Sequence, residues 1–208
     1  MPEAMTYTSL VSDIATYAER SDADFLAQVP RFIMLAENRL ASEFKGLGHI
    51  RVVSFDMTQG NNTYEKPARW RETLSMAITT TSRKKAIKNR SFEYIQTYWP
   101  DPSLEDVPEY YADYDYDHFF IGPTPDTTYP ASLTYYERPQ PLDDTNQTNW
   151  TTRYAPQALL YASLLEAQPF LKQSERIAEF QGLYDRAVGI LSSEDTRRQS
   201  DSSARRSK

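Results

Sequence analysis

Apolar positions recur at helical spacing near the start of the chain. In residues 7–20 they form one stripe, which predicts a helix with Thr8 or Ser9 as its N-cap. Residues 24–44 repeat the pattern, and Pro30 is expected in the first turn of this second helix. The two stripes consist of Leu10, Val11, Ile14, Tyr17 and Ala18, and of Phe32, Ile33, Leu35, Ala36, Leu40 and Phe44.

The helical pattern returns towards the end of the chain. Residues 156–170 carry a broad apolar face, and Pro156 suits the first turn of a helix. Residues 175–191 repeat apolar positions at helical spacing and are expected to form the last helix, with a kink or a break at Pro169 before it. The remaining residues, 192–208, are polar and of low complexity, so we expect them to be a flexible tail.

The middle of the chain has the texture of strands and turns. Strands are expected at residues 49–57, 64–66 and 69–78, with a turn at 60–62. Residues 84–87 fit a strand or a connector, and residues 90–98 fit a short helix. Residues 110–136 are expected to form two strands joined by a turn at 122–126. The more regular part, residues 131–137, alternates so that Leu133 and Tyr135 share a face.

These elements predict an α+β protein with three segments. Helices in residues 1–48 and 150–191 are expected to pack together as one bundle. Residues 49–149 then form a β-rich insertion between them. A disordered, basic C-terminal tail, residues 192–208, completes the expected architecture.

Composition narrows the class of protein. The formal net charge of −6 argues against a general nucleic-acid binder. The absence of cysteine excludes disulfides, thiolate metal sites and cysteine nucleophiles. The 15 tyrosines suit half-buried places such as subunit interfaces. No long apolar run or signal-peptide pattern occurs, so we expect a soluble protein made in a cytoplasm, with no membrane partner.

The stretch YYADYDYDHFFIGPTPD, residues 110–126, poses the main chemical question. Asp113, Asp115 and Asp117 alternate with aromatic residues, which predicts a strand with carboxylates on one face. Such a face could bind Ca²⁺, but His118 and Thr124 stand where an EF-hand loop needs its glycine and its glutamate. The alternative, which we favour, is a solvated strand edge that charge protects from edge-to-edge pairing.

Other candidates for catalysis are weak. The chain has two histidines, and no spacing gives either one the partners of a hydrolytic triad or a zinc site. The acidic pairs Glu105-Asp106 and Asp143-Asp144 lie in polar or proline-rich segments, where no apolar surroundings would raise a carboxyl pKa. Neither of the common phosphate-binding glycine motifs occurs. We therefore expect no catalytic residue, no cofactor and no metal.

Two basic segments are candidates for binding a partner. The first is a predicted loop with Arg83, Lys84, Lys85 and Lys88, which could face phosphate or a protein partner. The second is the C-terminal tail, whose basic residues are Arg197, Arg198, Arg205, Arg206 and Lys208. With Asp201 they give the last twelve residues a charge of +4, which leaves −10 for the rest of the chain.

Several phrases of the sequence resemble the head-to-tail adaptor (connector) proteins of tailed bacteriophages, in particular the podovirus type that attaches below the portal. The resemblance covers most of residues 7–172. Its most specific phrases are FIMLAENRL (32–40), IGPTPD (121–126), TYYERPQPL (134–142) and LLYASLLEAQPFLK (159–172).

The resemblance implies a structural virion protein. Such adaptors form a ring, usually of twelve copies, under the portal protein, and the ring surrounds the exit channel for double-stranded DNA. The helices form the ring, the β-rich part projects outward or towards the tail, and tail nozzle or tail fibre proteins attach to it. A C-terminal extension, here residues 192–208, docks on the portal, where its basic residues would meet an acidic surface.

Two other functions stay open from the sequence. One is a virion-associated glycosidase that degrades the cell wall, although no residue pair here matches such an activity. The other is a different connector, such as a tail terminator or stopper.

Overall fold

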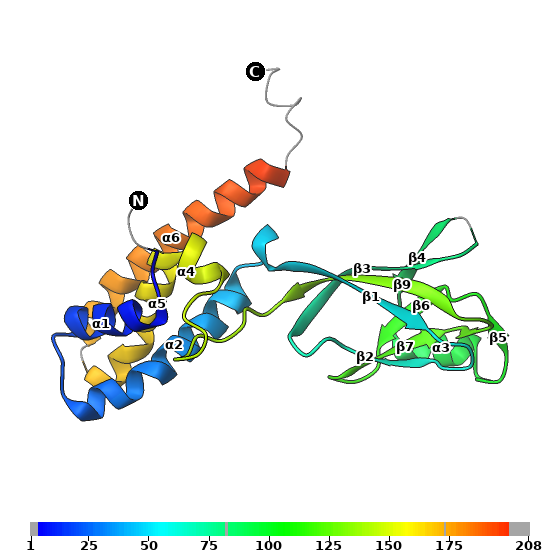
Figure 1. Ribbon diagram of the computed structural model, residues 1–208, viewed down its shortest axis with the longest axis horizontal. Coiled ribbons are helices and arrows are strands. Elements are labelled where there is room, and N and C mark those ends of the chain that lie inside the picture. The colour runs from blue at the N-terminus through cyan, green and yellow to red at the C-terminus, as the bar shows by residue number, and fades with distance from the viewer. Residues whose placement is uncertain (1–3, 82, 173, 200–208) are drawn as a thin grey trace, which may run out of the picture. The chain divides into compact units, whose positions relative to one another are not determined.

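The computed structural model describes residues 4–81, 83–172 and 174–199, and it divides the chain into two compact units. A helical unit is formed by Met1–His49 together with Arg138–Lys208, and a β-rich unit by Ile50–Glu137. Figure 1 shows helices at both ends of the chain and strands between them. The expected α+β class, with a β-rich insertion between N- and C-terminal helices, is confirmed.

The helical unit is built around α5, because α5 packs against α1, α2 and α6. Ala158, Leu159, Ala162, Leu164 and Ala167 are all buried, so α5 is apolar on nearly all sides, as expected for a helix inside a bundle. The elements of this unit are α1 (Tyr7–Ala18), α2 (Ala23–Glu43), η1 (Leu47–His49), α4 (Trp150–Tyr154), α5 (Pro156–Leu171), η2 (Ser174–Arg176) and α6 (Ile177–Gln199).

The N-cap of α1 and the place of Pro30 in α2 both differ from what the sequence predicted. Thr6, rather than Thr8 or Ser9, caps α1 and forms a reciprocal capping box with Ser9. Asp22 caps α2 by accepting a hydrogen bond from the Phe25 amide. Pro30 therefore lies inside a continuous helix, and its predicted place in the first turn is wrong. Its exposed position lets solvent satisfy the carbonyl that loses its partner.

The last helix continues beyond the end of its apolar stripe. The predicted flexible tail from residue 192 is wrong for residues 192–199, which are helical as part of α6. Asp195 is buried there and accepts a hydrogen bond from the Leu47 amide at 2.7 Å. A polar contact thus holds the last turns of α6 against the segment after α2. Residues 200–208 of the expected tail lie outside the described residues.

Residues 138–149 belong to the helical unit, although the insertion was expected to run to residue 149. The buried carboxylate of Glu37 on α2 holds this segment at two points. One oxygen accepts a hydrogen bond from the Asn149 side chain at 2.6 Å, and the other accepts one from the Leu142 amide at 3.2 Å. Desolvation is the reason that the pKa of Glu37 is raised to about 7.

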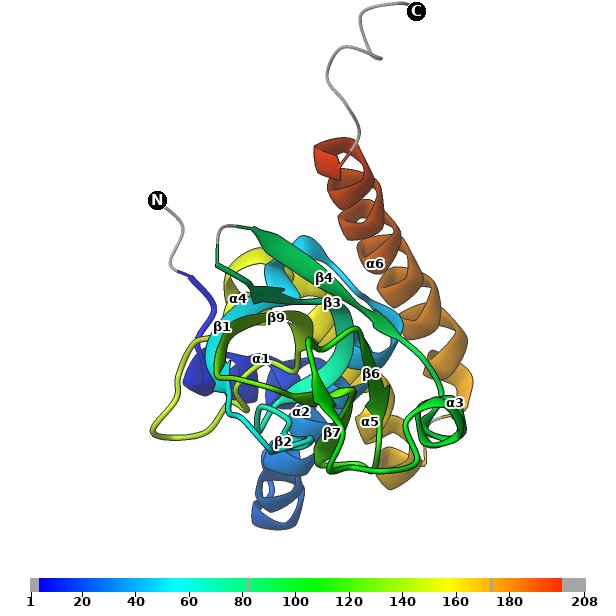
Figure 2. The same cartoon turned by 90° about the vertical axis from the view of Figure 1, so that its right-hand side faces the viewer.

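The β-rich unit, in the part of the chain that the structure describes, contains a seven-stranded sheet in the order β1-β9-β3-β4-β6-β7-β2 and a two-stranded ladder, β5-β8. Figure 2 shows the strands curving round one another. The elements are β1 (Ile50–Met57), β2 (Thr63–Glu65), β3 (Trp70–Thr79), β4 (Lys84–Asn89), α3 (Phe92–Tyr98), β5 (Glu105–Asp106), β6 (Tyr110–Asp113), β7 (His118–Gly122), β8 (Thr124–Pro125) and β9 (Tyr129–Glu137).

Strand β9 lies between β1 and β3 and supplies the centre of the sheet's core. Its buried residues alternate, Tyr129, Ala131, Leu133 and Tyr135, so the expected shared face of Leu133 and Tyr135 is confirmed. Against them pack Met57 of β1 and Met76 and Ile78 of β3, all fully buried. The period-two pattern therefore identifies the buried face of this strand correctly.

Glu37 makes the stability of the helical unit depend on pH. Since the pKa of Glu37 is about 7 in the folded protein, against an ordinary 4.5, the folded state holds its proton more tightly. The free energy of unfolding should therefore fall as pH rises from about 4.5 to about 7, by at most about 3 kcal/mol. Glu37→Gln should flatten this fall, measured by denaturant unfolding followed by circular dichroism.

The matched control is Glu179→Gln, which changes an exposed carboxyl on α6. This variant should keep the pH slope of the unsubstituted protein. An unchanged slope in the Glu37→Gln variant would contradict the assignment.

Candidate interaction surfaces

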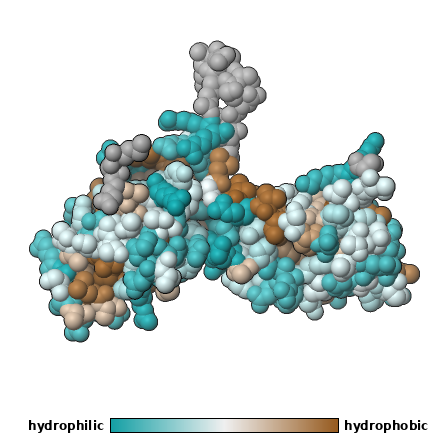
Figure 3. All heavy atoms as spheres, in the orientation of Figure 1, coloured by the Kyte–Doolittle hydropathy of each residue, from teal (hydrophilic) through white to brown (hydrophobic). Residues whose placement is uncertain are grey.

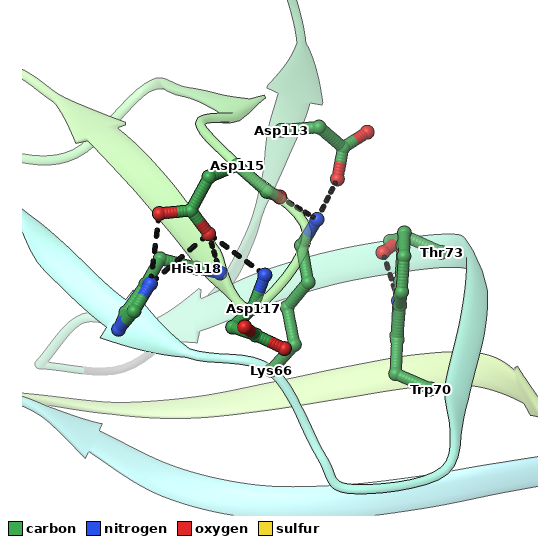
Figure 4. Close-up of polar contacts among 7 residues, drawn as sticks. All are labelled: Lys66, Trp70, Thr73, Asp113, Asp115, Asp117 and His118. Carbon is green, nitrogen blue, oxygen red and sulfur yellow. Dashed lines mark hydrogen bonds and ion pairs between the residues drawn. The ribbon is translucent and has the colours of Figure 1, made fainter.

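The acidic stretch of the sequence forms a hairpin turn instead of a strand face. β6 ends at Asp113 and β7 begins at His118, so the three aspartates lie at and around the turn, and the predicted single strand is wrong. Asp115 shapes the turn, because its carboxylate accepts hydrogen bonds from the Asp117 and His118 amides, both at 2.7 Å. The same carboxylate lies 3.0 Å from Nδ1 of His118 (Figure 4).

Lys66 occupies the place that a cation would take beside this turn. Its side chain is only 4% exposed, and Nζ lies 2.9 Å from the Asp113 carboxylate. It also donates to the Asp115 carbonyl at 2.8 Å and lies 4.0 Å from the centre of the Trp70 ring (Figure 4). The protein's own ammonium group thus pairs with the Asp113 carboxylate and the Asp115 carbonyl. Within residues 4–81, 83–172 and 174–199, no group of three or more His, Asp or Glu side chains could hold a metal ion.

In the acidic pair Asp143-Asp144 of the helical unit, Asp143 stabilises a loop. Asp143 accepts hydrogen bonds from the Thr145 hydroxyl and from the Thr145 and Asn146 amides. These bonds hold the pKa of Asp143 below its ordinary value, the side-chain bond most strongly. A carboxylate held ionised in this way shapes a loop, and it lacks the raised pKa of a general acid.

The first predicted basic segment forms a strand, so the strand alternative for residues 84–87 is confirmed and the predicted loop is wrong. Lys84, Lys85 and Lys88 lie on β4, and Arg83 precedes it. The ladder with β3 orders this segment, and it buries Ile87. Lys85 is paired with Glu109 at 3.1 Å, whereas Lys84 and Lys88 are exposed on the alternate positions of the strand.

The second predicted segment divides at the end of α6. Arg197 and Arg198 lie on the last turn of this helix. Positive charge is favourable there, because the C-terminal end of a helix carries a partial negative charge. Arg198 lies 4.0 Å from both Glu194 and Asp195, which is a loose ion pair. Arg205, Arg206 and Lys208 lie outside the described residues, so the structure brings together only the first two members of the predicted docking tail.

A hollow that the sequence analysis missed lies between α4, the start of α5 and the second half of α6. Its volume is about 220 Å³. Tyr154 and Ile190 on its border are 63% and 49% exposed, although both are large apolar residues. No sequence pattern could have joined them, since they come from different helices. Its lining includes Tyr154, Pro156, Ala187, Ile190, Leu191 and Glu194.

An aromatic cluster lies around α3 and is most exposed at Tyr98, whereas Tyr94, Trp99 and Tyr110 are half-buried. The rings of Tyr94 and Tyr98 on α3 are tilted against each other with their centres 4.6 Å apart, and the centre of the Tyr110 ring on β6 lies 5.3 Å from that of Trp99. The guanidinium of Arg90 lies over Tyr94 and Tyr110 at 5.6 and 5.8 Å. Aromatic residues with an arginine are enriched in protein interfaces. The tyrosine-rich composition indicated that the protein has tyrosine-containing contact surfaces, but it could not indicate where on the protein they lie.

The edge strand β1 carries a further apolar patch. Val52 is 66% exposed, and the surface over β1 is hydrophobic in Figure 3. β1 lies at one end of the strand order, and edges of this kind can accept another strand. No helix within the described part of the chain is long and apolar enough to cross a membrane.

These surfaces are candidates for contact with partner proteins. A family model described as SU10 adaptor protein matches residues 5–207, and the chain belongs to this family. The resemblance to phage head-to-tail adaptors is thereby confirmed, and the protein is a virion component. The podovirus type stays a prediction. No curated protein matches the sequence.

Lys66 should be essential to the β6–β7 turn. Lys66→Met keeps the length of the side chain but leaves the Asp113 carboxylate and the Asp115 carbonyl without their charged partner. The free energy of unfolding of the β-rich unit should fall by about 1.5–3 kcal/mol. Urea unfolding followed by tryptophan fluorescence would measure this, since Trp70 lies beside Lys66.

The control is Lys88→Met, which removes an exposed ammonium on β4. Its effect should stay within about 0.5 kcal/mol. An equal fall in the free energy of unfolding of the two variants would show that Lys66 does not stabilise the turn more than an exposed lysine does.

Proposed function

We propose that this adaptor forms a ring, of twelve copies, directly below the portal and joins the capsid to the tail. The observation that carries the proposal is the family match over residues 5–207 on a chain with two separate compact units. An adaptor must contact its own neighbours, the portal and the tail at once. A helical unit and a β-rich unit offer separate surfaces for these partners.

The C-terminal end of the chain is the part that we assign to the portal. Arg197 and Arg198 close α6, and Arg205, Arg206 and Lys208 follow within the next ten residues. The rest of the chain is acidic, so this end carries a charge opposite to that of its own body. An acidic portal surface would attract this end and not the rest of the adaptor.

The β-rich unit is the part that we assign to the tail. The aromatic cluster at Tyr94, Tyr98, Trp99 and Tyr110 is a candidate surface for a tail nozzle or tail fibre protein. Lys84 and Lys88 project from β4 and suit either such a partner or the phosphates of passing DNA. The net charge of the chain suits a channel through which double-stranded DNA slides without sequence-specific contacts.

Neither alternative function gains support from the described part of the chain. A glycosidase needs a pair of carboxyls in a cleft, one with a raised pKa. Glu37 has a raised pKa, but it is buried and bonded to the segment around Leu142 and Asn149. Nothing specific favours a terminator or stopper.

Electron microscopy of the protein, alone and mixed with the portal protein of the same phage, tests the proposal. We expect rings on the portal and would count their copies from top views. If the protein does not bind the portal and instead releases sugar from bacterial cell wall, the proposed adaptor ring is wrong.

Removing the basic end should weaken portal binding without unfolding the protein. Deleting residues 200–208 and changing Arg197 and Arg198 to Ser leaves Asp195 and its bond to Leu47 in place. The affinity for portal should fall at least several-fold, and the binding of the unsubstituted protein should weaken as ionic strength rises. Equal affinities of the two proteins would exclude docking through this end. Lys84→Ser with Lys88→Ser, which removes two exposed lysines from β4, is the control and should bind portal normally.

A further inference from the structure

The solvent face of α2 is unusually apolar for an exposed helix. Ala27, Pro30 and Met34 all lie on this face, and Leu26 and Leu35 flank it. Met34 is 47% exposed, although a methionine of a helical bundle usually faces the core. The opposite face of the same helix is filled with core residues such as Phe25, Val29 and Ile33. α2 therefore has two apolar faces, and the bundle uses one.

The hollow between α4, α5 and α6 is a second surface of the same unit at which large side chains, Tyr154 and Ile190, stay exposed. It is a concave site bordered by Ile190 and Tyr154, whereas the face of α2 is a convex ridge. Apolar surface that stays in contact with water costs free energy, and burying it in a partner is favourable. A ridge and a hollow on different helices of one chain can be buried against each other between two copies.

Charges beside the two surfaces agree with this pairing. On α2 the exposed Arg31 lies about one turn before Met34, and on α6 Glu194 lies one turn after Ile190. If the two helices run antiparallel with Met34 opposite Ile190, then Arg31 comes opposite Glu194. Opposite charges therefore meet at this step along the helices.

We infer that α2 of one copy packs into the α4–α5–α6 hollow of a second copy of this chain. Met34 is the side chain that enters the hollow, since a flexible thioether adapts to an irregular gap. The contact joins two different surfaces, so it is heterologous and can continue from copy to copy until a ring closes. This inference rests on the proposed ring and specifies which surfaces build it.

The absence of cysteine makes a clean test by cross-linking possible. Two full-length variants, Met34→Cys and Ile190→Cys, would be purified separately, mixed with portal and treated with a short bis-maleimide. The mixture should give a cross-linked adaptor dimer, and neither variant alone should give one. The chain with both substitutions should give a ladder of products up to the full ring. Ser12→Cys, at an exposed position of α1, replaces Met34→Cys in the matched control and should give no dimer with Ile190→Cys.

Microscopy of the same samples separates failure of this inference from failure of the ring. Rings without a mixed cross-link would overturn the α2–hollow contact and leave the proposed function standing. A cross-link from Cys at position 190 to portal instead of adaptor would assign the hollow to the portal and overturn the contact. The absence of any ring would overturn both the proposed function and the contact.

A charge exchange tests the register independently. Arg31→Glu and Glu194→Arg should each lower the yield of adaptor dimer several-fold, since each puts like charges opposite each other. The chain with both changes should recover the yield. If the double variant gives a still lower yield of cross-linked dimer than either single variant, the antiparallel register is contradicted.

Discussion

The burial of α5 is the constraint on which the rest of the helical unit depends. α1 and α2 precede the β-rich unit in the chain, and α5 and α6 follow it, so the core of this unit cannot form from either end alone. Leu10, Ile14 and Ile33 from the first part share a core with Leu159 and Tyr184 from the second. Contacts between residues so far apart in sequence carry a large entropic cost of loop closure. The β-rich unit limits this cost by folding into a compact body whose two ends lie together.

The pairing of β1 with β9 brings these two ends together. Ile50, the first residue of the β-rich unit, is opposite Tyr136, which is next to its last residue. Glu137 strengthens the junction, because its carboxylate accepts Arg51 at 3.1 Å and Arg69 at 2.7 Å. The chain therefore leaves and re-enters the helical unit through neighbouring antiparallel strands. An insertion arranged in this way is compatible with the packing of α2 on α5.

Sequence periodicity predicted those elements whose side chains are buried at regular intervals. The helices and the buried face of β9 follow from stripes of apolar residues, and the α+β class follows from their order. Periodicity could not show where α6 ends, because a hydrogen bond from Leu47 to Asp195, not an apolar residue, holds its last turns. It also failed at the acidic hairpin, where Asp115 accepts hydrogen bonds from the amides of the turn, and Lys66, far away in the sequence, pairs with Asp113. Alternating aspartates look the same in a strand and in a turn shaped by side chains.

The candidate surfaces share a physical feature that the sequence showed only in part. Basic residues could be listed in advance, since charge is visible without a structure. The apolar members, Val52 on β1, Met34 on α2 and Ile190 on α6, are exposed, and Met34 lies outside the apolar stripe predicted for its helix. Exposed apolar side chains that gather on one surface mark sites of contact with partners. In a protein that works by assembly, the positions where a single chain leaves apolar surface exposed are those where a neighbouring molecule is expected to complete the burial.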